Sequence, residues 1–115
     1  MIRTKRIYEK ADAKDGYRVL IDRLWPRGMK KEAAKIDLWM KDVAPSDALR
    51  KSFHHEAMKW PDFETKYRGE LKKKTDLLAK LRKKEKEHRT LTLLFGTRDL
   101  EHNQAVVLAE ALKAK

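Results

Sequence analysis

The stretch Tyr17-Arg18-Val19-Leu20-Ile21-Asp22-Arg23-Leu24-Trp25-Pro26-Arg27-Gly28 combines a strand signal with an abrupt stop. Its central residues 19–21 are all apolar, without alternation, which is typical of a strand covered on both faces. Pro26 and Gly28 prevent the strand from continuing. We therefore predict a buried strand over residues 17–22, followed by a loop rich in charged side chains.

A second apolar run, Leu91-Thr92-Leu93-Leu94-Phe95, predicts another buried strand. A long and mostly helical segment separates the two runs, and a crossover of that kind implies parallel strands. A weaker strand is predicted over residues 2–8, and the sequence leaves its direction open. The predicted fold class is α/β: a small parallel or mixed sheet of about three strands flanked by helices.

Between the two buried strands, local signals predict several helices. Residues 30–35 indicate a short helix, and residues 37–43 are expected to be irregular. Ser46 is the expected N-cap of a helix over 47–53, because its hydroxyl can accept from a backbone amide of the first turn.

The longest helix is predicted to begin near Pro61, which suits a first helical turn. Its apolar stripe has helical spacing and consists of Phe63, Tyr67, Leu71, Leu77, Leu78 and Leu81. The last helix is expected over about residues 100–114 with Asp99 as its N-cap.

Composition indicates one intracellular domain over residues 1–115. The chain has no cysteine, which excludes disulfides and thiolate metal sites and favours a cytoplasmic location. No apolar run approaches the ~20 residues that span a bilayer, so no membrane association is expected. The N-terminus also lacks the apolar stretch of a signal peptide. The oligomeric state is left open.

The net charge is +11, from 29 Lys and Arg against 18 Asp and Glu. Such an excess favours an anionic or polyanionic partner, and a surface adaptation rich in Lys and Glu explains it equally well. The basic runs 72–74 and 80–86 lie on the predicted long helix. They could bind a nucleic-acid backbone, or they could form the solvated face of an amphipathic helix.

Charged and polar side chains follow both buried strands. Ligands of open α/β sheets lie beyond the carboxyl ends of the strands, so these groups are expected to converge. The candidate catalytic residues are Asp22 and Asp99. The candidate anion-binding residues are Arg23, Arg27, Arg98, His102 and Asn103. In the alternative interpretation, Asp22 and Arg23 form an ion pair that holds the loop, Arg27 caps the Trp-Pro turn, and Asp99 is only a helix cap.

One histidine pair was considered as a metal site. His54 and His55 precede Glu56, but neighbouring residues point apart in a helix and face opposite sides of a strand. No metal site and no cofactor are therefore predicted.

The segment Arg18 to Gly28 resembles the signature of the YeaO-like proteins of the domain of unknown function 488 (DUF488) family. The resemblance continues through Asp37–Ser46 and through Leu49–Phe53 with His54, and it ends in Leu91–Phe95 and Asn103–Leu112. It implies a small α/β domain and supplies no activity. Longer relatives place an aspartate–arginine pair after the matching strand and a cysteine–histidine–arginine element near the last helix.

In this chain the first of these elements is Asp22-Arg23, and Glu101-His102-Asn103 replaces the second. Three hypotheses remain. The domain binds a phosphate- or carboxylate-bearing small molecule at the strand ends, with or without catalysis. Alternatively, it binds nucleic acid through the basic long helix, or it is a non-catalytic interaction protein.

Overall fold

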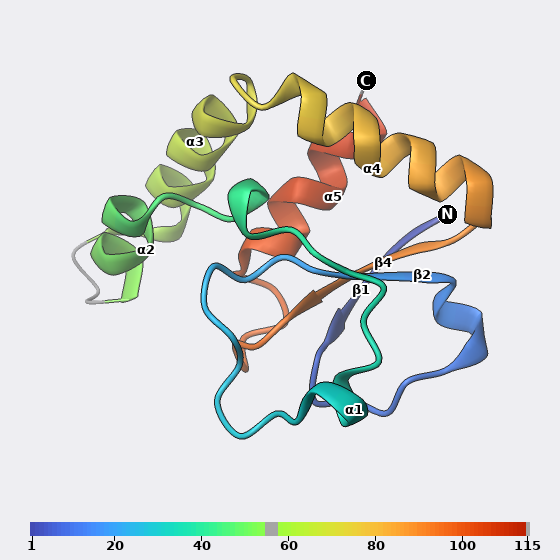
Figure 1. Ribbon diagram of the computed structural model, residues 1–115. Coiled ribbons are helices and arrows are strands. Elements are labelled where there is room, and N and C mark those ends of the chain that lie inside the picture. Colours follow the sequence, from blue (N-terminus) through green and yellow to red (C-terminus); the bar gives the residue numbers. More distant parts are fainter. Residues whose placement is uncertain (55–57, 115) are drawn as a thin grey trace.

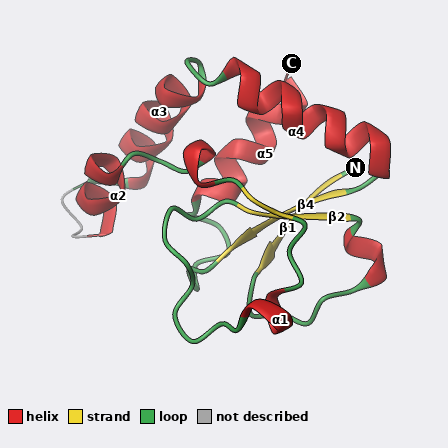
Figure 2. Ribbon diagram, viewed as in Figure 1, coloured by secondary structure: helices red, strands yellow, loops and turns green. Residues whose placement is uncertain are grey.

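The computed structural model describes residues 1–54 and 58–114. Their strands form one parallel four-stranded sheet in the order β1-β4-β2-β3 (Figure 2). The strands are β1 (Ile2–Arg6), β2 (Tyr17–Leu20), β3 (Leu38–Trp39) and β4 (Leu91–Phe95). The α/β class and the parallel pairing of the two apolar runs are confirmed, and the first strand is parallel as well.

The helices cover both faces of this sheet unequally. In Figure 1, α3, α4 and α5 lie over one face and the single-turn helix α1 lies on the other. The bounds are α1 (Lys31–Ala34), α2 (Asp47–His54), α3 (Trp60–Leu71), α4 (Thr75–His88) and α5 (Gln104–Ala114). Two 3₁₀ turns, Ala13–Asp15 and Lys41–Val43, complete the description.

Buried side chains of the two central strands point alternately to the two faces. Val19 and Leu93 join the large core under α3, α4 and α5, whereas Leu20 and Leu94 pack with Ile7 near α1. Each of these side chains is at most 1% exposed. Because both faces of these strands are buried, successive residues are all apolar and the sequence shows no alternation of apolar and polar residues.

The predicted long helix is in fact two helices. α3 ends at Leu71 and α4 begins at Thr75, because residues 72–74 close tight backbone turns onto Arg68, Glu70 and Leu71. Lys74 also donates its ammonium group to the Ala44 carbonyl oxygen at 3.1 Å. The apolar stripe continues across the break, so periodicity gave no sign of it.

Two further local predictions were wrong, and one was confirmed. Residues 37–43 are ordered as β3 and a 3₁₀ turn. Asp99 does not cap the last helix, since α5 begins at Gln104 and the Asn103 side chain accepts from the Val106 amide at 3.1 Å. Ser46 does cap α2, because its hydroxyl accepts from the Leu49 amide at 3.2 Å.

A buried ion cluster closes the amino-terminal end of the sheet. The Asp15 carboxylate is fully buried and lies 2.6 Å from the Arg18 guanidinium and 3.1 Å from the Lys5 ammonium group. The Thr92 hydroxyl donates to the Asp15 carbonyl oxygen at 2.7 Å, which joins the cluster to β4. Paired charges of this kind can be buried because each has an opposite charge or a hydrogen-bond partner.

Gly16 fixes the start of β2 beside β4, and its replacement gives a stability test. Its φ is +63°, and a Cβ atom there would lie 2.3 Å from the Thr90 carbonyl oxygen. Gly16→Ala should therefore lower the free energy of unfolding by about 3 kcal/mol in chemical denaturation. The matched control is Gly69→Ala on an exposed turn of α3, where no atom lies within 4 Å of the added methyl group. This variant should gain about 0.5–1 kcal/mol. Equal effects of the two substitutions would contradict the described turn.

Candidate functional site

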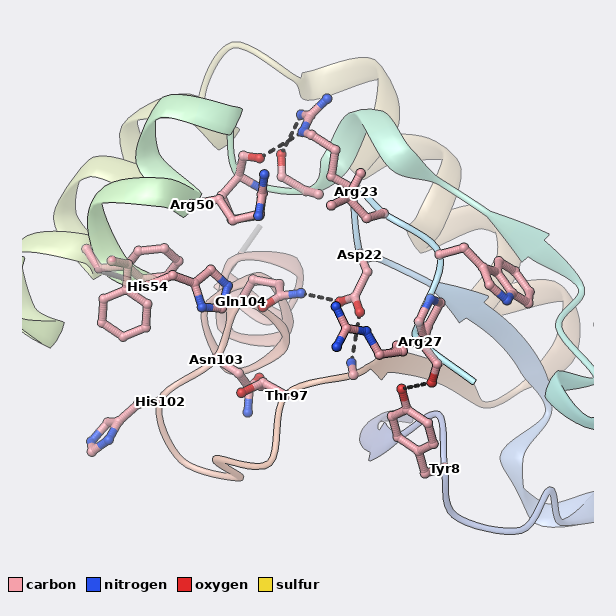
Figure 3. Close-up of a pocket in the computed structure, with 18 residues that line it drawn as sticks. Tyr8, Asp22, Arg23, Arg27, Arg50, His54, Thr97, His102, Asn103 and Gln104 are labelled. Carbon is pink, nitrogen blue, oxygen red and sulfur yellow. Dashed lines mark hydrogen bonds between the residues drawn. The ribbon is translucent and has the colours of Figure 1, made fainter. Parts of the chain in front are cut away.

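A cavity of about 300 Å³ opens at the carboxyl ends of β2 and β4, beside α2 and α3 (Figure 3). Ligands of open α/β sheets occupy this position. The lining comes from Tyr8, residues 22–27, Ala44, Pro45, Arg50, Phe53, His54, Phe63, Gly96, Thr97 and residues 102–104. The site therefore combines the loops after two strands with one face of a helical pair.

Asp22 joins three of these segments through its carboxylate. One oxygen accepts from the Gly96 amide at 2.9 Å and the other from the Gln104 side-chain amide at 2.5 Å. Its carbonyl oxygen also accepts from the Trp39 indole at 2.7 Å. Asp22 thus holds the end of β2 against β3, the end of β4 and the start of α5.

Burial dominates the electrostatics of this carboxylate. Removal from water raises the pKa of Asp22 from 3.8 to about 6, although the hydrogen bonds from Gly96 and Gln104 act in the opposite direction. No ion pair to Asp22 is present among the residues that the structure describes. Asp22 therefore does not form the ion pair with Arg23 that the sequence left open.

The Arg23 guanidinium is used within the protein. It donates to the carbonyl oxygens of Pro45 at 3.1 Å and of Ala44 at 3.3 Å. These bonds hold the segment that leads into α2 against the loop after β2. Arg23 lines the cavity, and two of its donors are already occupied.

Arg27 is differently placed. The Tyr8 hydroxyl donates to its carbonyl oxygen at 2.7 Å, which anchors the backbone, and the side chain projects into the group of labelled residues (Figure 3). Within the described part of the chain, no carboxylate lies at ion-pairing distance from Arg27. Its guanidinium is therefore available to a ligand.

One face of α2 supplies the other side of the cavity. Arg50, Phe53 and His54 follow the i, i+3, i+4 spacing that places side chains on the same face of a helix. A terminal nitrogen of Arg50 lies 3.3 Å from the largely exposed carboxylate of Asp47. Its Nε is the only buried side-chain polar atom without a hydrogen-bond partner among the described residues.

The lining has a marked charge imbalance. It contains three arginines and two histidines among its described members, and Asp22 is the single carboxylate there. Asp22 forms no ion pair with these arginines among the described residues, and both of its oxygens already accept hydrogen bonds, so the arginines outnumber the one carboxylate of the wall. This arrangement favours a ligand with an anionic group.

Comparisons with known proteins show the family of this chain. A family model described as "Inactive DUF488-N3 subclade" matches residues 1–115. The chain belongs to the DUF488 family. It is 41% identical to the uncharacterized protein YeaO of Escherichia coli K12 over 116 residues, covering 98% of this chain and 97% of the relative. It is 39% identical to the uncharacterized protein Rv3073c of Mycobacterium tuberculosis H37Rv, covering 99% and 95%.

No solved structure matches this DUF488 domain. Within residues 1–54 and 58–114, no helix is both long and apolar enough to cross a membrane. The same residues contain no group of three or more His, Cys, Asp or Glu side chains arranged for a metal ion. His55 and Glu56, considered above with His54, lie outside the described residues.

The structure brings together five of the seven residues that the sequence singled out for this DUF488 site. Asp22, Arg23, Arg27, His102 and Asn103 line the cavity, whereas Arg98 and Asp99 are exposed and lie outside its lining. Asp99 instead orders its own turn, because its carboxylate accepts from the amides of Glu101 and His102 at 2.9 Å.

His102 and Asn103 contribute mainly to the architecture of the cavity. The His102 ring lies 5.0 Å from the Trp60 ring and is turned away from Asp22 (Figure 3). The Asn103 amide donates to the Asp99 carbonyl oxygen at 2.8 Å and accepts from Val106. The asparagine is therefore occupied by its capping role.

Sequence reasoning missed Arg50 and Gln104, and it weighed His54 only for metal binding. The i, i+3, i+4 pattern of Arg50, Phe53 and His54, directly after the Ser46 cap, was the available signal. It indicated one helix face that is both cationic and aromatic. Gln104 carried no comparable signal, since its role follows from where α5 meets β2.

The pKa of Asp22 predicts a pH-dependent contribution to stability. Its folded value lies above the ordinary one, so the native state binds more protons and stability falls as pH rises from about 4 to about 6. Asp22→Asn removes this pH-dependent loss of stability. The variant can keep the hydrogen bonds to Gly96 and Gln104 if the side-chain amide of Gln104 rotates so that its oxygen faces residue 22. Its stability relative to the wild type should rise by up to about 3 kcal/mol between pH 4 and pH 7.5 in urea denaturation.

The matched control is Asp99→Asn. Hydrogen bonds from the amides of His102 and Glu101 lower the pKa of Asp99, so the relative stability of this variant should change mainly below about pH 4 and stay nearly constant between pH 4 and pH 7.5. If the difference in the free energy of unfolding between Asp22→Asn and the wild type were the same at pH 4 and pH 7.5, the pKa of Asp22 would not be raised in the folded protein.

Proposed function

We propose that this DUF488 domain is a non-catalytic binding protein for an anionic small molecule, held in the cavity at the carboxyl ends of β2 and β4. The observation that carries the proposal is the charge imbalance of the described lining. Its one carboxylate, Asp22, is engaged by Gly96 and Gln104, while Arg27 and Arg50 retain free donors. Arginine suits this task because its planar guanidinium can bind a phosphate or carboxylate through two parallel hydrogen bonds.

Arg50 has a buried side-chain donor that lacks a hydrogen-bond partner. A buried donor without a partner destabilises a protein by about 1–3 kcal/mol. The Arg50 Nε is such a donor, and Arg50 lines the cavity. If the Arg50 side chain turned its Nε toward the cavity, a ligand oxygen that accepted from it would remove that penalty, and the stabilisation would appear as binding affinity.

Four observations support a binding role over a catalytic one. The matching family model describes an inactive subclade, and the sequence contains no cysteine that could act as a nucleophile. Both oxygens of Asp22 hold the walls of the site together, and Asp99 lies outside the lining. We therefore assign Asp22 a positioning role rather than the role of a general base.

The anion pocket can be tested by an NMR chemical-shift titration with methyl phosphate and, separately, with acetate. Arg27→Gln and Arg50→Gln should each weaken binding about tenfold or more, because a hydrogen bond to a charged group is worth about 1.5–3 kcal/mol. Arg98→Gln is the matched control, since Arg98 is exposed on the neighbouring loop outside the lining. It should bind like the wild type.

Two results would contradict this proposal. If Arg98→Gln weakened binding as much as Arg27→Gln, the protein would be responding to overall charge and not to the cavity. If the wild type hydrolysed phenyl phosphate and Asp22→Asn abolished the turnover, the site would be catalytic.

Nucleic-acid binding through α4 is the second candidate, favoured by the exposed lysines Lys80, Lys83 and Lys86 on this helix. Other basic groups of α4 are already used, since Arg82 donates to the carbonyl oxygens of Ala111 and Leu112 at 3.0 and 3.1 Å.

If α4 binds nucleic acid, the wild type should bind duplex or single-stranded oligonucleotides in fluorescence anisotropy, with affinity falling steeply between 50 and 200 mM salt. The triple variant Lys80→Gln, Lys83→Gln, Lys86→Gln should then lose most of that binding, while Arg27→Gln retains it. Absence of binding by the wild type at 50 mM salt would rule this candidate out.

A further inference from the structure

The wall of the cavity formed by α2 and α3 is aromatic. Phe53 and Phe63 both line it, and their ring centroids lie 4.5 Å apart. Trp60 extends the cluster behind them, with centroids 5.8 Å from Phe53 and 5.4 Å from Phe63. Phe63 is buried at the base of this cluster, whereas Phe53 is only partly buried and has surface left on the cavity side.

The aromatic and cationic groups reach the same cavity from different elements. Phe53 lies three residues after Arg50 on α2, so that helix presents a ring and a guanidinium side by side. Arg27 enters from the loop after β2 (Figure 3). A ligand that touches all three side chains must therefore combine an apolar part with an anionic part.

The size of the cavity restricts that ligand further. At about 300 Å³ it lies at the lower end of the range for small-molecule sites. This volume accommodates about one ring with one charged substituent, and it is too small for a long polyanion. Its lining contains three arginines, which suit planar and bidentate recognition of a single phosphate or carboxylate.

We infer that the pocket selects a planar aromatic ring that carries a single phosphate or carboxylate group, with the ring against Phe53 and the anionic group between Arg27 and Arg50. This inference rests on the proposed anion-binding function and specifies its ligand class. Phe53 determines specificity because ring–ring contacts are directional and stabilise more than burial of the same apolar area. The arginines then fix the orientation of the ligand.

The test compares ligands that share an anionic group and differ in the attached group. NMR titrations of the wild type with methyl, cyclohexyl and phenyl phosphate should give affinities that increase in this order. We expect phenyl phosphate to bind about tenfold tighter than methyl phosphate and about threefold tighter than cyclohexyl phosphate. A parallel series of acetate, cyclohexanecarboxylate and benzoate identifies which anionic group the arginines prefer.

A variant separates the ring contact from the anion contact. Phe53→Leu should abolish the difference in affinity between phenyl and cyclohexyl phosphate. Tyr17→Leu is the control, because this aromatic ring lies at the start of β2 beside His88, outside the cavity lining. It should retain the full preference for phenyl phosphate. Melting temperatures establish that both variants are folded.

The outcomes distinguish this inference from the proposal on which it rests. Equal binding of phenyl and cyclohexyl phosphate by the wild type would overturn the aromatic specificity and leave the anion pocket intact. This comparison needs no variant, so it holds even if Phe53→Leu does not fold. If none of the phosphates or carboxylates bound, the anion pocket and the ring specificity would both be wrong.

Discussion

The carboxylate of Asp22 holds together the end of the sheet where the cavity opens. It accepts hydrogen bonds from Gly96 after β4 and from Gln104 at the start of α5, while its own backbone accepts from Trp39. A Cβ atom at Gly96 would lie 2.9 Å from the carboxylate, so the close approach of the two loops depends on glycine. The energetic cost of burying this charge appears as its raised pKa.

The charge of the cavity follows from this use of Asp22. A carboxylate with both oxygens occupied is poorly placed to neutralise an arginine, and Arg23 is likewise engaged with the carbonyl oxygens of Ala44 and Pro45. Arg6 stabilises the opposite loop by donating to the carbonyl oxygens of Gly96 and Thr97 at 3.0 and 2.9 Å. The framework therefore uses one set of charged groups, whereas Arg27 and Arg50 line the cavity, with Arg50 paired to the largely exposed Asp47.

The sequence was sufficient to predict the parts of the fold that depend on burial of apolar residues and on the direction of the chain. The apolar runs 17–22 and 91–95 predicted two parallel strands, and chain direction placed Asp22, Arg27 and Asn103 at the same edge. The break between α3 and α4 was not predictable from periodicity, because it depends on backbone turns at residues 72–74 and on a tertiary contact from Lys74.

The same distinction applies to the candidate site. Asp99 and Asn103 are both good capping residues, and only the position of α5 decides between them. Arg50 lies far from either strand in the sequence, so the rule about strand ends could not include it. Its contribution depends on how α2 packs across the end of the sheet, which is a property of the tertiary structure.

The buried cluster of Asp15, Lys5 and Arg18 lies at the other end of β2 from the cavity. Interactions that are well separated contribute to stability almost independently. Natural variation at Arg27, Arg50 or Phe53 can therefore change the chemistry of the pocket while the ion cluster continues to hold the strands in register. Such a division gives a physical reason why the ligand of the cavity can change within a lineage while the scaffold is inherited unchanged.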